Sequence, residues 1–182
     1  MFSHLRLWFY NPMSDNTGYF NKMVAYIDGP FCHCEIQFPD ETAFTVYMGT
    51  NVIKKQRHFD HSKYTCVKIP CSFQQIKTAR EYADTEADMD RSFSLLMMTL
   101  AFSALSVPES QGTFCSKLCA DILIAANLFT AQDTRHISPS ALFRWLHREY
   151  VEKTTLPCLA IDFNAQKHLV VAKKGKEGHK VH

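Results

Sequence analysis

The chain is poor in glycine. Six glycines in 182 residues do not readily supply the Gly-rich loop with which nucleotide-binding proteins cradle phosphates. The Gly-x-Ser-x-Gly turn that carries the nucleophile of many serine hydrolases is missing, and the carboxylates show no pairing typical of glycosidases. These absences argue against a P-loop enzyme, a serine hydrolase of that type and a glycosidase.

The sequence also lacks an apolar run long enough to span a bilayer. The longest, Phe93 to Val107, contains three serines and a threonine, and therefore predicts a buried helix. Residues 1–12 lack the charged start, apolar middle and cleavage site of a signal peptide. The seven cysteines are an odd number, and without a signal they indicate free thiols in a reducing compartment.

Excess positive charge is confined to one end of the chain. The formal charge is +2, and residues 173–182 alone hold four lysines and one glutamate. We therefore expect no nucleic-acid-binding surface on the body of the protein. Length and a hydrophobic content of 46% predict a single domain over residues 1–172, followed by a basic disordered tail over residues 173–182.

The hydrophobic pattern predicts an α+β protein, because short alternating segments are mixed with segments of helical period. Strands are expected at 5–10, 32–38, 43–48, 52–53 and 64–69, with a terminal hairpin at 159–163 and 168–172. Helices are expected at 16–26, 72–85, 91–105 and 115–127 and from Ser138, with Ser138 as N-cap and Pro139 in the first helical position.

A cysteine stands at the start of one of these helices, in the sequence GTFCSKLCADIL that begins at Gly112. Thr113 is the expected N-cap. A thiol in the first helical turn lies among unpaired N–H groups at the positive end of the helix dipole, which favours the thiolate. Cys115 is therefore a candidate nucleophile, and a buried structural cysteine is the alternative. The apolar stripe of this helix comprises Cys115, Leu118, Cys119, Ile122 and Ala126, and we expect Cys119 to be inert core packing.

His33 is the candidate general base. On a strand, His33, Glu35 and Gln37 share one face. The other face then carries Cys34, Ile36 and Phe38. A carboxylate beside an imidazole holds its tautomer and raises its basicity. The alternative is that this polar face is simply solvated.

The sequence Cys32-His33-Cys34 also invites a metal-site interpretation. Zinc needs about four ligands in paired clusters, and the spacing of Cys66 and Cys71 is too long for the usual second pair. The two cysteines beside His33 should moreover face away from it. We expect no metal and no cofactor.

Four short motifs in one order resemble the NlpC-like branch of papain-like thiol hydrolases, in the circularly permuted form where the histidine strand precedes the cysteine helix. DGPFCHCEIQF (28–38) is similar to the family's S-P-x-S-H-V-E-L-x-F segment, and FCSKLCA (114–120) to its F-C-S-E-x-V-A helix start. ISPSALF (137–143) matches the S-P-x-x-L closing helix, and NVIK (51–54) the G-V-R-x-K strand. The resemblance covers about residues 5–148.

The resemblance implies a permuted papain-like fold, with an antiparallel sheet or small barrel packed against the cysteine helix. It implies that Cys115 is the nucleophile, that His33 is the general base, and that the backbone N–H of Cys115 belongs to the oxyanion hole. A third catalytic residue would orient His33, and Glu35, Thr45 and Tyr47 all match that place.

The implied substrate contains a peptide, amide or acyl bond. Such proteins are frequent in phages and large DNA viruses, which by analogy suggests a viral protein, cytoplasmic or virion-associated. The chain departs from the family at Cys32, Cys34 and Lys117, where serine, valine and an acidic residue are usual. Lys117 could assist ionisation of the thiol, although we expect it to lie in solvent. The alternative function is a catalytically idle scaffold that serves as a viral structural or host-interaction protein.

Overall fold

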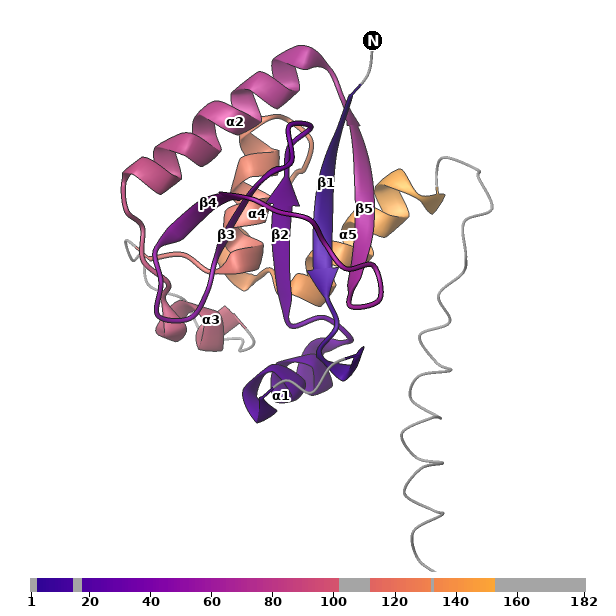
Figure 1. The fold of residues 1–182 in the computed structure, drawn as a ribbon. Coiled ribbons are helices and arrows are strands. Elements are labelled where there is room, and N and C mark those ends of the chain that lie inside the picture. Colours follow the sequence, from indigo (N-terminus) through magenta and orange to yellow (C-terminus); the bar gives the residue numbers. More distant parts are fainter. Residues whose placement is uncertain (1–2, 15–17, 102–111, 132, 153–182) are drawn as a thin grey trace, which may run out of the picture.

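A single antiparallel sheet of five strands forms the centre of the protein (Figure 1). The computed structural model describes residues 3–14, 18–101, 112–131 and 133–152. The strand order is β4-β3-β2-β1-β5, and all neighbouring strands are antiparallel. The strands are β1 (Ser3–Tyr10), β2 (His33–Gln37), β3 (Thr42–Val46), β4 (Val52–Gln56) and β5 (Tyr64–Cys71).

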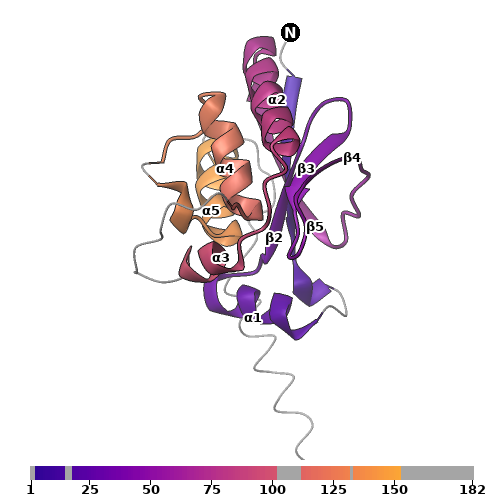
Figure 2. The ribbon, with the colours of Figure 1, turned by 90° about the vertical axis from the view of Figure 1, so that its left-hand side faces the viewer.

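Helices α2, α4 and α5 lie on one side of this sheet, as the side view shows (Figure 2). Helix α1 lies at the end of the sheet where β2 begins, and α3 lies near the same end (Figure 1). The predicted α+β class is therefore confirmed. The helices are α1 (Tyr19–Asp28), α2 (Phe73–Asp88), α3 (Leu95–Ala101), α4 (Cys115–Ala125) and α5 (Pro139–Tyr150), with 3-10 turns η1 (Pro12–Ser14) and η2 (Thr134–His136).

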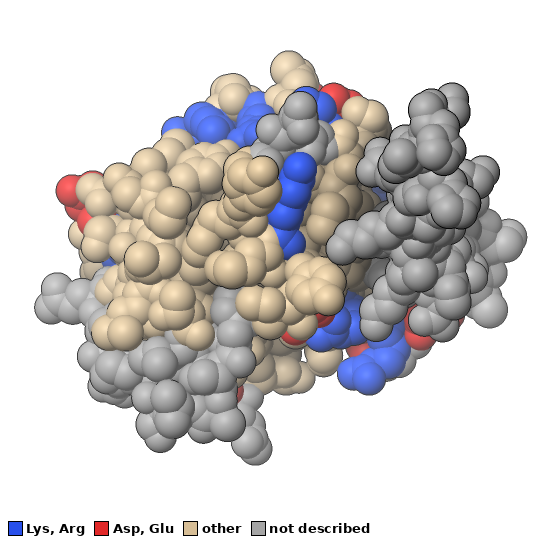
Figure 3. Space-filling view, turned by 90° about the horizontal axis from the view of Figure 1, so that it is seen from below, with Lys and Arg blue, Asp and Glu red and all other residues tan. Residues whose placement is uncertain are grey.

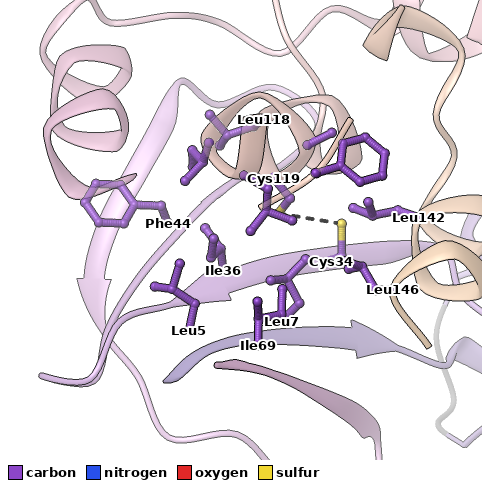
Figure 4. Packing of buried hydrophobic residues seen from close by; sticks show 14 of the residues in the cluster. Leu5, Leu7, Cys34, Ile36, Phe44, Ile69, Leu118, Cys119, Leu142 and Leu146 are labelled. Carbon is purple, nitrogen blue, oxygen red and sulfur yellow. Dashed lines mark hydrogen bonds between the residues drawn. The ribbon is translucent and has the colours of Figure 1, made fainter. Parts of the chain in front are cut away.

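The core fills the space between the sheet and α4 and α5 (Figure 4). Cys34 and Ile36 point from β2 toward Leu118 and Cys119 of α4, as the alternation of β2 and the helical stripe predict. Each large apolar side chain buried in this way contributes about 2 kcal/mol, so this layer fixes how α4 sits on β2.

The opposite face of the sheet is covered as well, so the alternative of a solvated polar face on β2 does not hold. Glu35 and Gln37 are both buried. The segment between β4 and β5 folds over them: Phe59 stacks on Trp8 with ring centroids 4.6 Å apart, and Trp8 Nε1 donates to Gln37 Oε1 at 2.9 Å. Burial makes every polar group on this face dependent on a protein partner.

The predicted buried helix at 91–105 is only partly correct. The chain is extended before α3, because Ser92 bridges to Asn51 and Phe93 bridges to Thr113. Within α3, Met97 is buried, whereas Leu95 and Leu96 are exposed. Residues 102–111 lie outside the described part of the chain, as do the predicted terminal hairpin and basic tail.

Helix α1 begins at Tyr19 and not at residue 16. Val24 of this helix is buried, whereas Met23 and Ile27 are exposed. The reason is position: α1 lies beyond the end of the sheet and contacts mainly η1 and α5. None of the helices in the described ranges combines the length and apolar character that crossing a membrane requires.

Candidate active site

The two residues predicted to form a catalytic pair meet in the structure. Cys115 is the first residue of α4 and His33 the first residue of β2, and α4 packs directly on β2 and β3. The two groups are close enough for the charge of each to shift the pKa of the other. Two distant parts of the sequence thus place a thiol and an imidazole side by side.

The start of α4 differs from the prediction in its cap. The N-cap is Phe114, which makes no side-chain cap hydrogen bond, and not Thr113. Thr113 is instead held in extended backbone, donating its N–H to the carbonyl of Ser92 at 3.0 Å and accepting from the N–H of Ser94 at 2.8 Å. The first-turn amides of α4 have no acceptor within the helix and no capping side chain, so they can stabilise an anion at Cys115.

The surroundings of Cys115 favour the thiolate. Hydrogen bonding to Cys34 and then the charge and hydrogen bond of His33 outweigh burial, and they hold the pKa of Cys115 well below its ordinary value of 9.0. Burial alone would lower the pKa of His33, but Cys115 and Glu35 raise it to about 9. Each group therefore stabilises the charged form of the other.

Thr45 fixes the orientation of the His33 ring. Its hydroxyl donates to the carbonyl of Cys34 at 3.2 Å and lies 3.1 Å from His33 Nε2. A hydroxyl has one proton, so with that proton on the Cys34 carbonyl the Thr45 oxygen accepts from Nε2–H. This leaves Nδ1 as the ring nitrogen available to exchange a proton with Cys115. The contact is the one expected of the third catalytic residue.

Glu35 and Tyr47, the other two candidates for that place, also contact the imidazole. Glu35 Oε1 lies 3.6 Å from His33 Nε2, and the ring of Tyr47 stacks on that of His33 with centroids 4.7 Å apart. Tyr47 donates its hydroxyl to Glu35 Oε1 at 2.9 Å. Thr45 therefore supplies the direct hydrogen bond to His33, and Glu35 supplies a nearby negative charge. The ring of Tyr47 packs against one face of the imidazole.

Arg57 neutralises the buried Glu35. Its Nη1 lies 2.5 Å from Glu35 Oε1, it also donates to Tyr47, and its Nη2 donates to the Tyr64 hydroxyl at 2.7 Å. Burial would raise the pKa of Glu35, but the bond and charge of His33 and the charge of Arg57 lower it. Glu35 is therefore an anion although its side chain is fully buried.

Sequence reasoning missed the roles of Cys34 and Arg57. The alternation of β2 placed Cys34 correctly in the core, and there it lies 3.8 Å from the Cys119 sulfur and beside Cys115. The prediction that Cys119 packs in the core is confirmed. Nothing in the sequence near Arg57 pointed to Glu35, because their contact depends on how the segment after β4 folds back over the sheet.

Lys117 does not lie free in solvent, so that expectation is wrong. Its Nζ is 2.5 Å from Asp121 Oδ2, one helical turn further along α4, and Asp121 also accepts from the Thr134 hydroxyl at 2.7 Å. The lysine thus forms an ion pair within α4, and the hydrogen bond from Thr134 to Asp121 links this pair to η2.

No metal site is evident in the described ranges, where no three His, Cys, Asp or Glu side chains are placed to share an ion. Cys32, Cys34, Cys66, Cys71, Cys115 and Cys119 are all free thiols. Comparison with protein-family models, with curated proteins and with solved structures finds no match to this chain. The site is therefore interpreted from its own geometry.

Proposed function

We propose that this protein is a thiol hydrolase that cleaves an amide or related acyl bond through a covalent thioester on Cys115. The observation that supports the proposal best is the pairing of Cys115 with His33. Each group shifts the pKa of the other toward the charged form, and the thiol is the first residue of an uncapped helix. A purely structural cysteine needs neither a base nor a helix terminus.

In the acylation step the Cys115 thiolate attacks the carbonyl carbon and forms a carbon–sulfur bond. The oxygen becomes an oxyanion, which the backbone N–H of Cys115 and the first turn of α4 stabilise. One such donor is worth roughly 3 kcal/mol, or on the order of a hundredfold in rate. As the intermediate collapses, His33 gives its proton to the leaving amine, and the acyl group remains on sulfur.

In the deacylation step His33, now neutral, accepts a proton from a water molecule. The resulting hydroxide attacks the thioester carbonyl, the carbon–sulfur bond breaks, and the carboxylic acid product leaves. His33 and Cys115 return to the imidazolium and thiolate forms. Thr45 keeps Nδ1 directed at the reaction through both steps, because its oxygen holds Nε2–H.

The alternative function is a catalytically idle scaffold. The observation that favours it is low exposure: Cys115 is 6% exposed and the His33 side chain 14%. A catalytically idle protein would keep the fold and the buried Cys115 thiol, but that thiol would not be accessible to a substrate.

Alkylation separates the two functions. The full chain is treated with iodoacetamide at pH 7, and labelling of each cysteine is followed by mass spectrometry. We expect Cys115 to react far faster than the core thiol Cys119, and His33→Ala to slow only Cys115. Wild type and Cys115→Ser are then compared with an electrophilic amide or ester probe, which should label only the wild type. Equal slow labelling of both thiols would reject the hydrolase and leave the idle scaffold.

A further inference from the structure

A pocket lies on the face of the sheet that is turned away from α4 and α5. Its floor is formed by side chains of β1, β2 and β5, which alternate with the apolar residues that these strands turn into the core. The segment between β4 and β5 crosses above this floor (Figure 1). The pocket has a volume of about 290 Å³. We call it the outer pocket, and its floor residues are Arg6, Trp8, Gln37, Cys66 and Lys68.

The wall above the floor is aromatic. Phe59 is stacked on Trp8, and the ring of His61 meets the Trp8 ring edge-on, with centroids 5.0 Å apart. Gln37 accepts from Trp8 Nε1, and its own Nε2 donates to the carbonyl of Arg57 at 2.7 Å. Gln37 is only 3% exposed, so these bonds are held inside the fold. The outer pocket is therefore a hollow with fixed walls and not a gap between loose surface side chains.

Two cations lie side by side on the floor. Arg6 of β1 and Lys68 of β5 are direct partners in the antiparallel register, so their Cβ atoms are only about 5 Å apart. Like charges in directly opposite positions destabilise a sheet. Burial raises the pKa of the neighbouring Cys66 thiol to about 11, while the charges of Lys68 and Arg6 both act to lower it. Both positive charges therefore act on the same part of the floor.

No carboxylate neutralises this pair within the described part of the chain. Arg6 makes one long hydrogen bond, from Nη1 to Gln37 Oε1 at 3.5 Å, and the side chain of Lys68 makes no ion pair there. Glu41 also lines the pocket, but its Oε2 lies 3.6 Å from His58 Nδ1. The two cations thus share a hollow without a counter-charge of their own.

Other cations of the sheet do have carboxylate partners. Lys54 of β4 lies 2.7 Å from Asp84, and Arg57, just after β4, lies 2.5 Å from Glu35. Positive charge is also not spread evenly over the surface, since Figure 3 shows mostly uncharged side chains over what is described at the end of the molecule that carries α1 and α3. The uncompensated pair in the outer pocket is therefore a local feature, and an anion would neutralise it.

We infer that the outer pocket binds the phosphate group of a small phosphorylated compound. A phosphate monoester carries nearly two negative charges at neutral pH, which matches the two cations. The guanidinium of Arg6 has donors for two phosphate oxygens at once, and the ammonium of Lys68 adds a point charge. The aromatic wall suits a ring or an apolar group in the rest of the ligand. A volume of about 290 Å³ is at the lower end of small-molecule sites, so the ligand is small.

This site is separate from the proposed catalytic pair. Its lining includes none of Cys115, His33 and Thr45, and it lies on the face of the sheet opposite to α4 (Figure 2). The inference therefore does not rest on the proposed hydrolase activity, and either can fail without the other.

Calorimetric titration of the full chain with phenyl phosphate tests the site. The buffer is free of phosphate, and benzoate, which has the same ring but one negative charge, is the comparison ligand. We expect phenyl phosphate to bind at least about tenfold more tightly than benzoate, and inorganic phosphate to compete with it. Arg6→Gln and Lys68→Gln should each weaken binding at least about tenfold, because each removes a charged donor. Added salt should weaken binding as well.

Lys77→Gln is the matched control. It changes the net charge by the same amount on α2, where Lys77 Nζ lies 3.8 Å from Glu81, and it should leave binding unchanged. The inference is overturned if neither phenyl phosphate nor inorganic phosphate binds, or if benzoate binds as tightly as phenyl phosphate. It is also overturned if Lys77→Gln weakens binding as much as Arg6→Gln, because the attraction would then be to the charge of the whole molecule.

The fluorescence of Trp8 shows where the ligand binds. The other tryptophan, Trp145, is on α5 and packs on Phe129 with ring centroids 4.4 Å apart, so Trp145→Phe leaves Trp8 as the single reporter. Saturation with phenyl phosphate should change the emission of this variant. An unchanged spectrum would place the ligand outside the outer pocket.

Stability separates a ligand site from a pair of cations with a structural role. Without phosphate, Lys68→Gln should be at least as stable in urea as the wild type, because it removes a repulsion. Phenyl phosphate should stabilise the wild type more than this variant, since a ligand stabilises the protein that binds it. A variant that is less stable without the ligand, and that gains as much from it as the wild type, would overturn the inference.

Discussion

The hydroxyl of Thr45 lies 3.1 Å from Nε2 of His33. A hydrogen bond to a charged group is worth about 1.5 kcal/mol or more, which is roughly tenfold in an equilibrium constant. Thr45→Val removes the acceptor of Nε2–H and should therefore destabilise the imidazolium. We expect the pH midpoint of Cys115 alkylation to rise by about one unit.

Thr45→Ser is the control, because it keeps the hydroxyl and should keep the wild-type pH profile. The rate of iodoacetamide labelling, measured from pH 5 to 9, compares the three proteins. A Val variant with an unshifted profile would show that Thr45 does not position His33.

Arg57 is expected to be essential to the stability of the sheet face that it covers. Arg57→Gln would remove the cation that lies 2.5 Å from the fully buried Glu35 and leave only His33 as a positive neighbour, and breaking a buried pair costs about 3 kcal/mol. The free energy of unfolding in urea measures the loss.

The double variant Glu35→Gln/Arg57→Gln tests this cause, because it also removes the negative charge that Arg57 neutralises. The double variant should be more stable than Arg57→Gln alone. If adding the second substitution does not recover stability, the ion pair with Glu35 is not what Arg57 contributes.

The dyad should also make stability depend on pH in a particular window. The pKa of His33 is 6.5 in the unfolded chain and about 9 in the fold. Its contribution to stability is therefore complete below pH 6.5 and is lost between pH 6.5 and about 9. The pKa of Cys115 is lowered from 9.0, so its contribution is complete above pH 9 and is lost as the pH falls. The two contributions therefore change in opposite directions between pH 6.5 and about 9.

Below pH 6.5 only the Cys115 slope remains. Where the thiol is still ionised in the fold, the folded pair holds one proton and the unfolded pair two, so stability falls by about 1.4 kcal/mol for each unit by which the pH drops. Urea unfolding of wild type and Cys115→Ser between pH 5 and 9 should show a stability difference that shrinks as the pH falls. A difference that stays constant down to pH 5 would mean that the thiol is protonated in the fold.

Lys117 should have no part in ionising the thiol, because its ammonium is occupied by Asp121. Lys117→Met is expected to leave the pH profile of Cys115 alkylation unchanged and to lower stability by less than about 1 kcal/mol. His33→Gln, in contrast, should shift that profile strongly. An upward shift with Lys117→Met would make the lysine a second cation for the thiolate.

Local patterns predicted the elements that carry the site. The alternation of β2 placed Cys34 and Ile36 in the core, and the stripe of α4 placed Cys119 there too. Ser138 is the N-cap expected from its position. These predictions succeed because capping and hydrophobic period depend on residues a few positions apart.

Contacts between distant segments could not be predicted in the same way. Thr113 was the better N-cap by residue type, but its backbone is held in a bridge to Phe93, so Phe114 takes that place. The pairing of Arg57 with Glu35 likewise depends on a segment that folds back over the sheet. In both cases tertiary structure overrides the local preference, and it does so beside the candidate active site.

The segment before His33 is held by one serine of α5, which gives a last prediction. The hydroxyl of Ser140 accepts from the N–H of Phe31 at 3.1 Å and lies 3.2 Å from the carbonyl of the same residue. Ser140→Ala would leave these buried backbone groups without that partner, at a cost of about 2 kcal/mol, and would release the chain just before His33. We expect lower stability in urea together with slower alkylation of Cys115. Ser138→Ala removes the N-cap of the same helix at about 1 kcal/mol, together with the bond of its hydroxyl to Asp28, but it does not touch Phe31, so it should lower stability and slow alkylation less than Ser140→Ala does. If both variants slow alkylation equally, the effect comes from general loss of stability and Ser140 has no specific role in placing His33.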